Sequence, residues 1–160
     1  MLLGILSDTH GHRENARAAV NLLAGLEVDA VIHCGDIGSP DIVGLFSGWP
    51  THFVLGNVDD QSRAFKSAIQ AAGQTFHGRF GSLELAGRKI AFLHSDDARL
   101  FQATVTGGEY DLVCYGHTHV AEQHQVGKTL VLNPGALYRA PRHTIAVVRL
   151  PEVEATHITV

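Results

Sequence analysis

Four clusters of Asp, Asn and His side chains in this chain each follow a short apolar run. Three of the four clusters are entered directly through a glycine. Carboxylates, imidazoles and carboxamides are groups that bind metal ions and transfer protons. Their repeated position at the end of an apolar run therefore indicates one shared site. The clusters are Asp8-Thr9-His10-Gly11, Gly35-Asp36, Gly56-Asn57-Val58-Asp59 and Gly116-His117-Thr118-His119.

The spacing within two clusters favours metal binding. Asp8 and His10 are two residues apart, as are His117 and His119, so in extended backbone each pair projects from one side and can reach a common ion. Imidazoles beside carboxylates, without cysteine, suit Mn, Fe, Co, Ni or Zn better than a site built for Mg or Ca. The candidates exceed the needs of one tetrahedral ion, which favours two ions sharing a carboxylate. They are Asp8, His10, Asp36, Asn57, His94, His117 and His119.

The charge of such a site predicts its substrate class. Two divalent ions, two carboxylates and one bridging hydroxide leave a net charge of about one positive unit. That charge suits an anionic substrate, and phosphate esters are the natural class. Paired ions would generate the hydroxide, orient it and stabilise the charge on the phosphoryl oxygens. We therefore expect a small phosphoester as substrate and attack by a bridging hydroxide.

In the first half of the chain, predicted strands and helices alternate, and the strands position these clusters. Short apolar runs predict strands over residues 2–7, 30–34 and 51–55, and the second of these is rich in β-branched residues. Apolar residues at helical spacing, with Ser39-Pro40 as a helix start, predict the intervening helices over 13–26, 39–46 and 62–72. This βαβαβα order favours a parallel sheet, and open parallel sheets bind ligands at the carboxyl ends of their strands.

The second half has a different pattern, with strands joined by tight turns. Two hairpins are expected, 80–85 with 89–94 and 122–126 with 128–132. A short helix over 97–106 and strands over 111–115, 144–150 and 153–160 complete the chain. We therefore predict an α/β fold with two mixed sheets. No linker or low-complexity segment interrupts it, so residues 1–160 are expected to form a single domain.

Composition excludes several other functions. The net charge is −4 and the twelve basic residues are scattered, so no specific nucleic-acid binding is expected. Met1 leads directly into the first apolar run and no run has the length of a membrane span. We therefore expect a cytoplasmic protein without membrane association. The only cysteines, Cys34 and Cys114, are expected to be reduced core residues.

The order of the motifs resembles that of the calcineurin-like metallophosphoesterases. The four clusters, with His94 before the last of them and Asn133-Pro134-Gly135 after it, span residues 4 to about 142. The Gly-Asn-x-Asp form of the third motif and the Asn-Pro-Gly turn are most similar to the small YfcE-type phosphodiesterases and their archaeal relatives. This resemblance implies a four-layer α/β/β/α sandwich and a metal-dependent phosphodiesterase activity.

The resemblance also implies which residue does what. Asp8, His10, Asp36 and His119 would hold the first metal, and Asp36, Asn57, His94 and His117 the second. Asp36 would then bridge the two ions, of which manganese is the expected identity. We accordingly expect Asp36, Asn57 and His94 to be the catalytic residues.

Two positions depart from the family pattern. Many members carry a histidine after the Asn of the third motif, where it assists the leaving group, but this chain has Val58. The fourth motif is often His-Gly-His, but here His94 is followed by Ser95 and Asp96. Ser95 adds a side chain where glycine is expected, and would narrow the approach to the second metal.

The remaining polar residues have simpler interpretations. Asp96 and Asp97 precede a helix and are expected to cap it. His33 lies within a buried run and is expected to be a core residue. Arg139, Arg142 and His12 are the candidates for binding substrate. The other histidines are expected on the surface or in loops rather than as ligands: His52, His77, His124, His143 and His157.

Two alternative functions remain open at this point. One is a phosphomonoesterase of the same fold, and the other is a catalytically retired scaffold resembling the retromer subunit. The complete set of ligands argues against the scaffold. A homo-oligomer is compatible with the sequence, which does not specify an oligomeric state.

Overall fold

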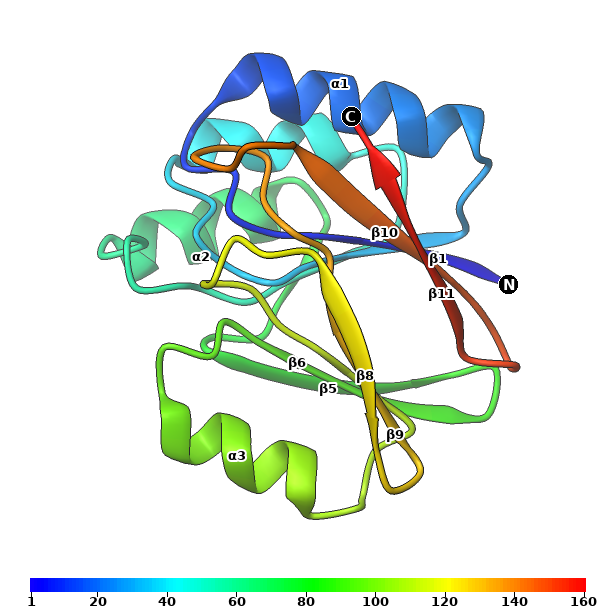
Figure 1. The fold of residues 1–160 in the computed structure, drawn as a ribbon. Helices are drawn as coiled ribbons and strands as arrows, with labels where there is room; N and C mark the ends of the chain where they lie inside the picture. Colours follow the sequence, from blue (N-terminus) through cyan, green and yellow to red (C-terminus); the bar gives the residue numbers. More distant parts are fainter.

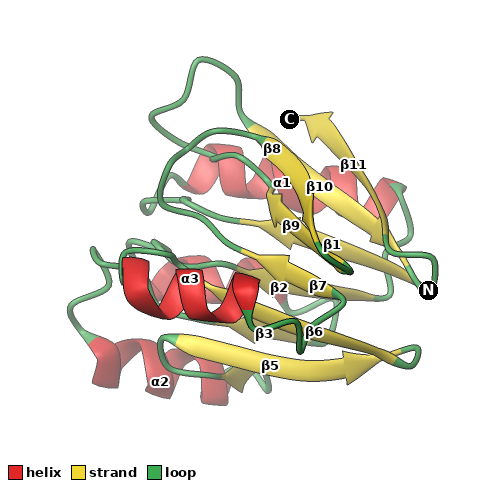
Figure 2. Ribbon diagram, turned by 60° about the horizontal axis from the view of Figure 1, so that its bottom comes forward, coloured by secondary structure: helices red, strands yellow, loops and turns green.

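The computed structural model describes residues 1–160 and contains two β-sheets packed face to face, with helices on both outer faces (Figure 1). Its layers therefore follow the predicted α/β/β/α order. In Figure 2, α3 lies in front of the sheets, with α1 and α2 behind them. None of the helices combines the length and apolar character needed to cross a membrane.

The first sheet has six strands in the order β11-β10-β1-β2-β3-β4. Strands β1 to β4 are parallel. Strand β10 lies antiparallel beside β1, and β11 pairs antiparallel with β10 at the edge of the sheet. The helical segments α1, η1 and α2 connect the parallel strands and pack their apolar faces on this sheet. The elements are β1 Leu2–Leu6, α1 Arg13–Gly25, β2 Ala30–His33, η1 Pro40–Phe46, β3 Thr51–Phe53, α2 Ser62–Ala71, β4 Thr75–Phe76, β10 Thr144–Arg149 and β11 Glu154–Thr159.

The second sheet has five strands in the order β5-β6-β7-β9-β8. Its centre is parallel, from β6 through β7 to β9, and each edge is the antiparallel partner of a hairpin. Both predicted hairpins are therefore confirmed. The elements are β5 Phe80–Leu85, β6 Arg88–Leu93, α3 Ala98–Thr106, β7 Leu112–Cys114, β8 Glu122–Val126 and β9 Thr129–Asn133.

Three apolar layers hold the sandwich together. One lies between the first sheet and its helices, one between the two sheets, and a smaller one under α3. Cys34 and Cys114 are buried, unpaired members of the layer between the sheets, as predicted. Because β2 and β7 face apolar layers on both sides, their residues are buried throughout, which explains their continuous hydrophobic runs.

The differences from the predicted elements are local. The segment 39–46 begins as predicted, with the Ser39 side chain accepting the Asp41 amide and Pro40 in the first position, but it is a 3-10 helix. Strand β4 was not predicted, because two residues are too few to show an alternating pattern. Strand β3 ends at Phe53, although Val54 and Leu55 remain buried beyond it.

Candidate metal centre

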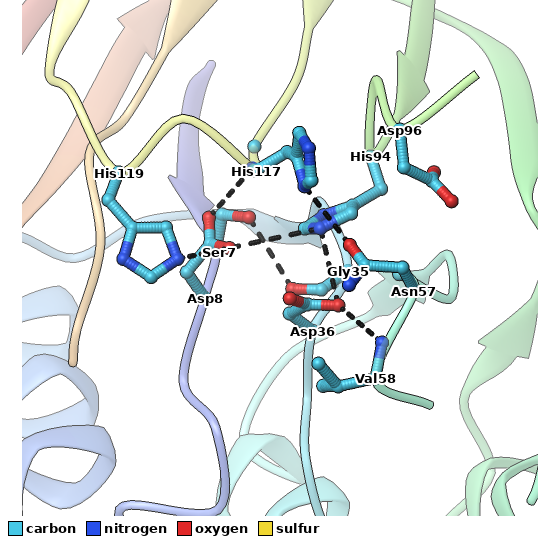
Figure 3. A network of polar contacts seen from close by, with 12 residues as sticks. Ser7, Asp8, Gly35, Asp36, Asn57, Val58, His94, Asp96, His117 and His119 are labelled. Carbon is cyan, nitrogen blue, oxygen red and sulfur yellow. Dashed lines mark hydrogen bonds and ion pairs between the residues drawn. The ribbon is translucent and has the colours of Figure 1, made fainter. Parts of the chain in front are cut away.

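The clusters meet where the parallel strands of both sheets end. The loops after β1, β2 and β3 bring residues from the first sheet, and those after β6 and β7 bring histidines from the second (Figure 3). All of the predicted ligands lie in this region, linked by close contacts between neighbouring side chains. The two sheets are therefore joined at their shared edge by a polar site.

One group of potential ligands consists of Asp8, His10 and His119. His119 Nε2 lies 3.2 Å from Asp8 Oδ1 and 3.2 Å from His10 Nε2. His10 Nε2 also lies 3.6 Å from Asp36 Oδ2. Three of the four residues implied for the first metal thus form one group, and the fourth, Asp36, adjoins it through His10.

A second group consists of Asp8, Asp36 and His94. His94 Nε2 lies 3.2 Å from Asp36 Oδ1 and 3.9 Å from Asp8 Oδ1. Asn57 and His117 adjoin this group: His117 Nδ1 is 3.0 Å from Asn57 Oδ1, and its ring centroid is 5.1 Å from that of His94. Asp36 thus directs one oxygen toward His10 and the other toward His94, and Asp8 belongs to both groups.

Two buried polar atoms in the centre lack a hydrogen-bond partner. They are Asp8 Oδ1 and His94 Nε2, in residues that are almost completely buried. The approach of His94 Nε2 to Asp36 does not have hydrogen-bond alignment. Because buried polar atoms are nearly always paired, two orphans facing each other point to a missing ligand between them. A divalent cation would satisfy both atoms.

The outward nitrogens of two imidazoles are already occupied. His94 Nδ1 donates to the Cys34 carbonyl at 2.9 Å, and His119 Nδ1 donates to the Arg139 carbonyl at 3.2 Å. These bonds leave the Nε2 lone pairs facing the carboxylates. Metal-binding histidines characteristically use their second nitrogen in this way. The donor set therefore fits divalent transition-metal ions.

Burial and charge shift the pKa values of the central groups. Burial raises the pKa of Asp8. Burial also opposes ionisation of Asp36, but the adjacent His94 ring and the Val58 amide outweigh it and lower the pKa of that carboxyl. Burial likewise opposes protonation of His94, yet the Asp36 and Asp8 carboxylates raise its pKa above the ordinary value. Positive charge is thus stabilised between the two carboxylates.

The backbone of the site is not extended, contrary to the sequence-based expectation. Left-handed φ angles of 54° at Asp8, 49° at His10, 75° at His117 and 60° at His119 turn the chain at each ligand. Asp8 and His10 still reach one group. His117 and His119 diverge instead, His119 toward Asp8 and His117 toward Asn57. Backbone strain of this kind is concentrated at functional sites.

Close approach of loops explains the glycines that precede the ligands. A Cβ at Gly56 would lie 2.0 Å from Asp36 Oδ1, and one at Gly116 would lie 2.0 Å from Ser7 Oγ and 2.8 Å from Asp8 Oδ2. No side chain fits at either position. The loops from different strands can therefore pack directly against the carboxylates of Asp36 and Asp8.

Two supporting residues were not identified from the sequence. Asp59 is buried and accepts hydrogen bonds from the backbone amides of Ile37, Gly38 and Gly56 at 2.8–3.1 Å. It therefore ties the loop after β2 to the loop after β3. The only signal was its place in the third motif, three residues after the glycine.

The second supporting residue is Asn133, in the Asn-Pro-Gly turn. Its Nδ2 donates to the Gly116 carbonyl at 3.2 Å and to Thr118 Oγ1 at 3.0 Å, and its Oδ1 accepts the Gly135 amide. It thus holds the loop that carries His117 and His119. The motif was recognisable in the sequence, but its role as a loop support was not.

The three candidates for binding substrate lie near the centre in different settings. Arg139 is exposed, with its guanidinium 5.6 Å from the centre of the Tyr138 ring. Arg142 lines a cavity that His119 also lines. His12 caps α1 by accepting the Asn15 amide, and its ring stacks on Tyr138 with centroids 5.0 Å apart. No sequence pattern pointed to Tyr138.

The other expectations have mixed outcomes. Asp97 caps α3 as predicted, whereas Asp96 forms an ion pair with Arg79 and is not a cap. The Asp96 prediction was wrong because Arg79, distant in sequence, supplies a stronger partner. His33 is a satisfied core histidine, bonded to Thr9 Oγ1 at 2.7 Å and to the Gly35 amide. Neither metal-binding group includes any of the histidines expected on the surface or in loops.

Comparisons with known proteins agree with these observations. A model of the calcineurin-like phosphoesterase superfamily domain matches residues 1–153. Phosphodiesterase MJ0936 of Methanocaldococcus jannaschii is 32% identical over 138 residues, covering 84% of this chain and 83% of that protein. The probable metallophosphoesterase YsnB of Bacillus subtilis is 30% identical over 142 residues, covering 86% of this chain and 75% of that protein.

Solved structures show the same fold. One, described as a novel archaeal phosphodiesterase, aligns with a TM-score of 0.92 and 30% identity over 100% of both chains. The E. coli phosphoesterase YfcE aligns with a TM-score of 0.69 and 16% identity over 99% of this chain and 98% of that one, a likeness of fold. Motifs, fold and family model agree: the chain belongs to the calcineurin-like phosphoesterase superfamily.

Proposed function

We propose that the protein is a phosphodiesterase that hydrolyses a small phosphoester with the help of two divalent transition-metal ions, most suitably manganese. The observation that carries the proposal is the pair of buried, unpartnered atoms Asp8 Oδ1 and His94 Nε2 within a ring of carboxylates and imidazoles. The name of the related MJ0936 protein, a phosphodiesterase, supports the choice of diester over monoester.

The residues have distinct parts in this proposal. Two bound ions would supply a hydroxide at neutral pH and positive charge for the phosphoryl oxygens. Asp36 presents one oxygen to each group of ligands and is therefore assigned as the bridging carboxylate. Asn57 and His117, the more exposed ligands, border the open side, where the substrate enters. Val58, which is 40% exposed at this rim, has no group that can protonate a leaving oxygen.

A direct assay tests the proposal. Protein stripped by chelator is reloaded with Mn, Ni, Fe, Co, Zn or Mg and assayed on bis(p-nitrophenyl) phosphate and on p-nitrophenyl phosphate, with released nitrophenolate as the readout. We expect turnover of the diester, highest with manganese, and weaker turnover of the monoester. Faster hydrolysis of the monoester would identify a phosphomonoesterase. Stoichiometric metal binding without turnover of either ester would identify a scaffold.

A further inference from the structure

A cavity of about 510 Å³ opens beside the metal centre. The loop after β7, the segment before β10 and the exposed edge strand β11 form its walls, and His119, Val120, Arg142, His157 and Thr159 are among its lining residues. His119 belongs to both sites, because its Nε2 lies 3.2 Å from Asp8 Oδ1. A phosphate bound at the metals would therefore have this cavity next to one of its substituents.

The lining is suited to an organic group that carries hydroxyls. It contains Arg142, which has no carboxylate within salt-bridge distance, and it contains no Asp or Glu. His157 Nε2 donates to the Asn133 carbonyl at 2.7 Å, which leaves Nδ1 as a hydrogen-bond acceptor. Val120, 58% exposed, adds an apolar surface. Together these groups offer a cation, an acceptor and a surface for the face of a ring.

The opposite side of the centre is much more confined. There a cavity of about 160 Å³ is lined by His94, Asp96, Arg79 and Leu100, among others. Figure 3 shows His119 on one side of the carboxylates and Asp96 on the other. Sites for small molecules have volumes of about 300–1,000 Å³, a range that includes only the cavity on the His119 side.

We propose that the cavity beside His119 binds one ester group of the substrate, a hydroxyl-bearing group of sugar or nucleoside size. This inference rests on the proposed phosphodiesterase function and specifies its substrate class. Arg142 would donate hydrogen bonds to oxygen atoms of the ester group, and His157 Nδ1 would accept a hydrogen bond from one of its hydroxyls. Val120 would cover one face of its ring. A substrate with one large and one small ester group then fits the two unequal sides of the centre.

The test compares two diesters with the same leaving group: thymidine 5′-(p-nitrophenyl phosphate) and methyl p-nitrophenyl phosphate. Thr159→Trp places a bulky ring in the cavity from β11. Thr156→Trp, on the same strand but the opposite face because side chains alternate, is the matched control. We expect Thr159→Trp to lower kcat/KM for the thymidine ester by about tenfold, or about 1.4 kcal/mol, and to leave the methyl ester within about twofold.

The outcomes separate the two proposals. Equal effects of Thr159→Trp on both esters, or no effect on either, would overturn the cavity assignment while the phosphodiesterase function stands. Failure of the wild type to hydrolyse either diester would instead reject the proposed function, and the cavity assignment with it. A second readout needs no metal. Thymidine 5′-monophosphate is added to chelator-treated protein, and its binding should shift the NMR amide resonances of Val120 and Thr159. Shifts that avoid these amides would also overturn the assignment.

Discussion

At the scale of single residues, Asp36 is the best test of the two-metal proposal. Its Oδ2 lies 3.6 Å from His10 Nε2 and its Oδ1 lies 3.2 Å from His94 Nε2, so it contacts both ligand groups. In Asp36→Asn one oxygen becomes an uncharged NH₂ group, which cannot bind a cation. We expect occupancy of both ions to fall, by more than the roughly 10–100-fold that loss of a supporting contact costs.

Metal analysis after dialysis measures this effect directly, and the nitrophenolate assay should show activity lost in parallel. Asp41→Asn, which changes an exposed carboxylate in η1, is the control and should retain both ions. An Asp36→Asn protein that keeps two ions and normal turnover would show that Asp8 alone connects the two groups.

Ser95 connects two loops at the cost of backbone strain. Its φ is 77°, a conformation that favours glycine, and its hydroxyl donates to the Gly116 carbonyl at 3.2 Å. Ser95→Ala removes the bond and keeps the strain, whereas Ser95→Gly removes both. We therefore expect Ser95→Ala to lower the free energy of unfolding by about 1 kcal/mol, and Ser95→Gly to be the more stable of the two variants.

Urea unfolding of the three proteins in chelator tests this comparison. If Ser95→Gly were less stable than Ser95→Ala, the φ angle would not be the dominant cost at this position.

His33 should make the fold sensitive to acid. Complete burial lowers the pKa of His33 to about 3, from an ordinary 6.5. Below pH 6.5 the unfolded chain therefore binds a proton that the folded chain excludes, and stability falls as the pH falls toward 3. At pH 5 this group alone should have removed about 2 kcal/mol from the free energy of unfolding.

The variant His33→Gln cannot take up that proton. We expect it to be less stable than the wild type at pH 7, because the hydrogen bond between His33 and Thr9 is lost. Its free energy of unfolding should, however, fall less steeply between pH 7 and pH 5. Urea unfolding in chelator gives both slopes. The exposed His124→Gln is the control and should reproduce the wild-type slope. Parallel slopes for His33→Gln and wild type would exclude His33 as the sensitive group.

At the scale of elements, the site depends on hydrogen bonds between the loops that follow neighbouring strands. Asp59 links the loops after β2 and β3 through three backbone amides, and it belongs to neither group of potential metal ligands. In Asp59→Ala these three amides lose their charged hydrogen-bond acceptor at a position where water cannot easily replace it. We expect a loss of about 3 kcal/mol or more in unfolding free energy, and a smaller loss for Asp59→Asn, which keeps one oxygen.

Hydrogen exchange at Ile37, Gly38 and Gly56 identifies the mechanism, because these amides should lose protection beyond the global loss of stability. Asp60→Ala, in the exposed neighbouring residue, should change neither stability nor exchange by a measurable amount. Unchanged protection at the three amides in Asp59→Ala would contradict the assigned role.

At the scale of the whole molecule, the predicted metal ligands come from both sheets. Asp8, Asp36 and Asn57 follow strands of the first sheet, and His94 and His117 follow strands of the second. Bound metal should therefore crosslink the sheets and stabilise the folded chain. At a concentration 100 times Kd, one ion contributes about 2.7 kcal/mol, or roughly 5–10 °C in Tm for a chain of this size.

Thermal unfolding with and without manganese measures this shift, and chelator should reverse it. Asp36→Asn should show a much smaller shift than the wild type at the same manganese concentration. An unchanged Tm in protein that demonstrably holds two ions would mean that the metals do not join the sheets.

Much of the fold, and which polar side chains gather at the candidate metal centre, could be predicted from sequence because the signals are local. Buried parallel strands such as β2 require continuous apolar residues, so they are visible as short β-branched runs. The predicted ligands follow at the carboxyl ends of these strands, where Gly56 and Gly116 admit close contact between loops. Metal binding then restricts the side chains at those positions to a few types.

Other features depended on contacts between distant residues, and only the tertiary structure could decide them. The divergence of His117 from His119 follows from left-handed backbone angles that the packing of neighbouring loops imposes. Asp96 forms an ion pair with Arg79, which is 17 residues away in the sequence. Asp59 and Asn133 form hydrogen bonds that support loops following other strands. Local sequence specifies which groups are available, whereas their partners are set by the packing of the two sheets, because hydrogen bonds and ion pairs depend on distances in space.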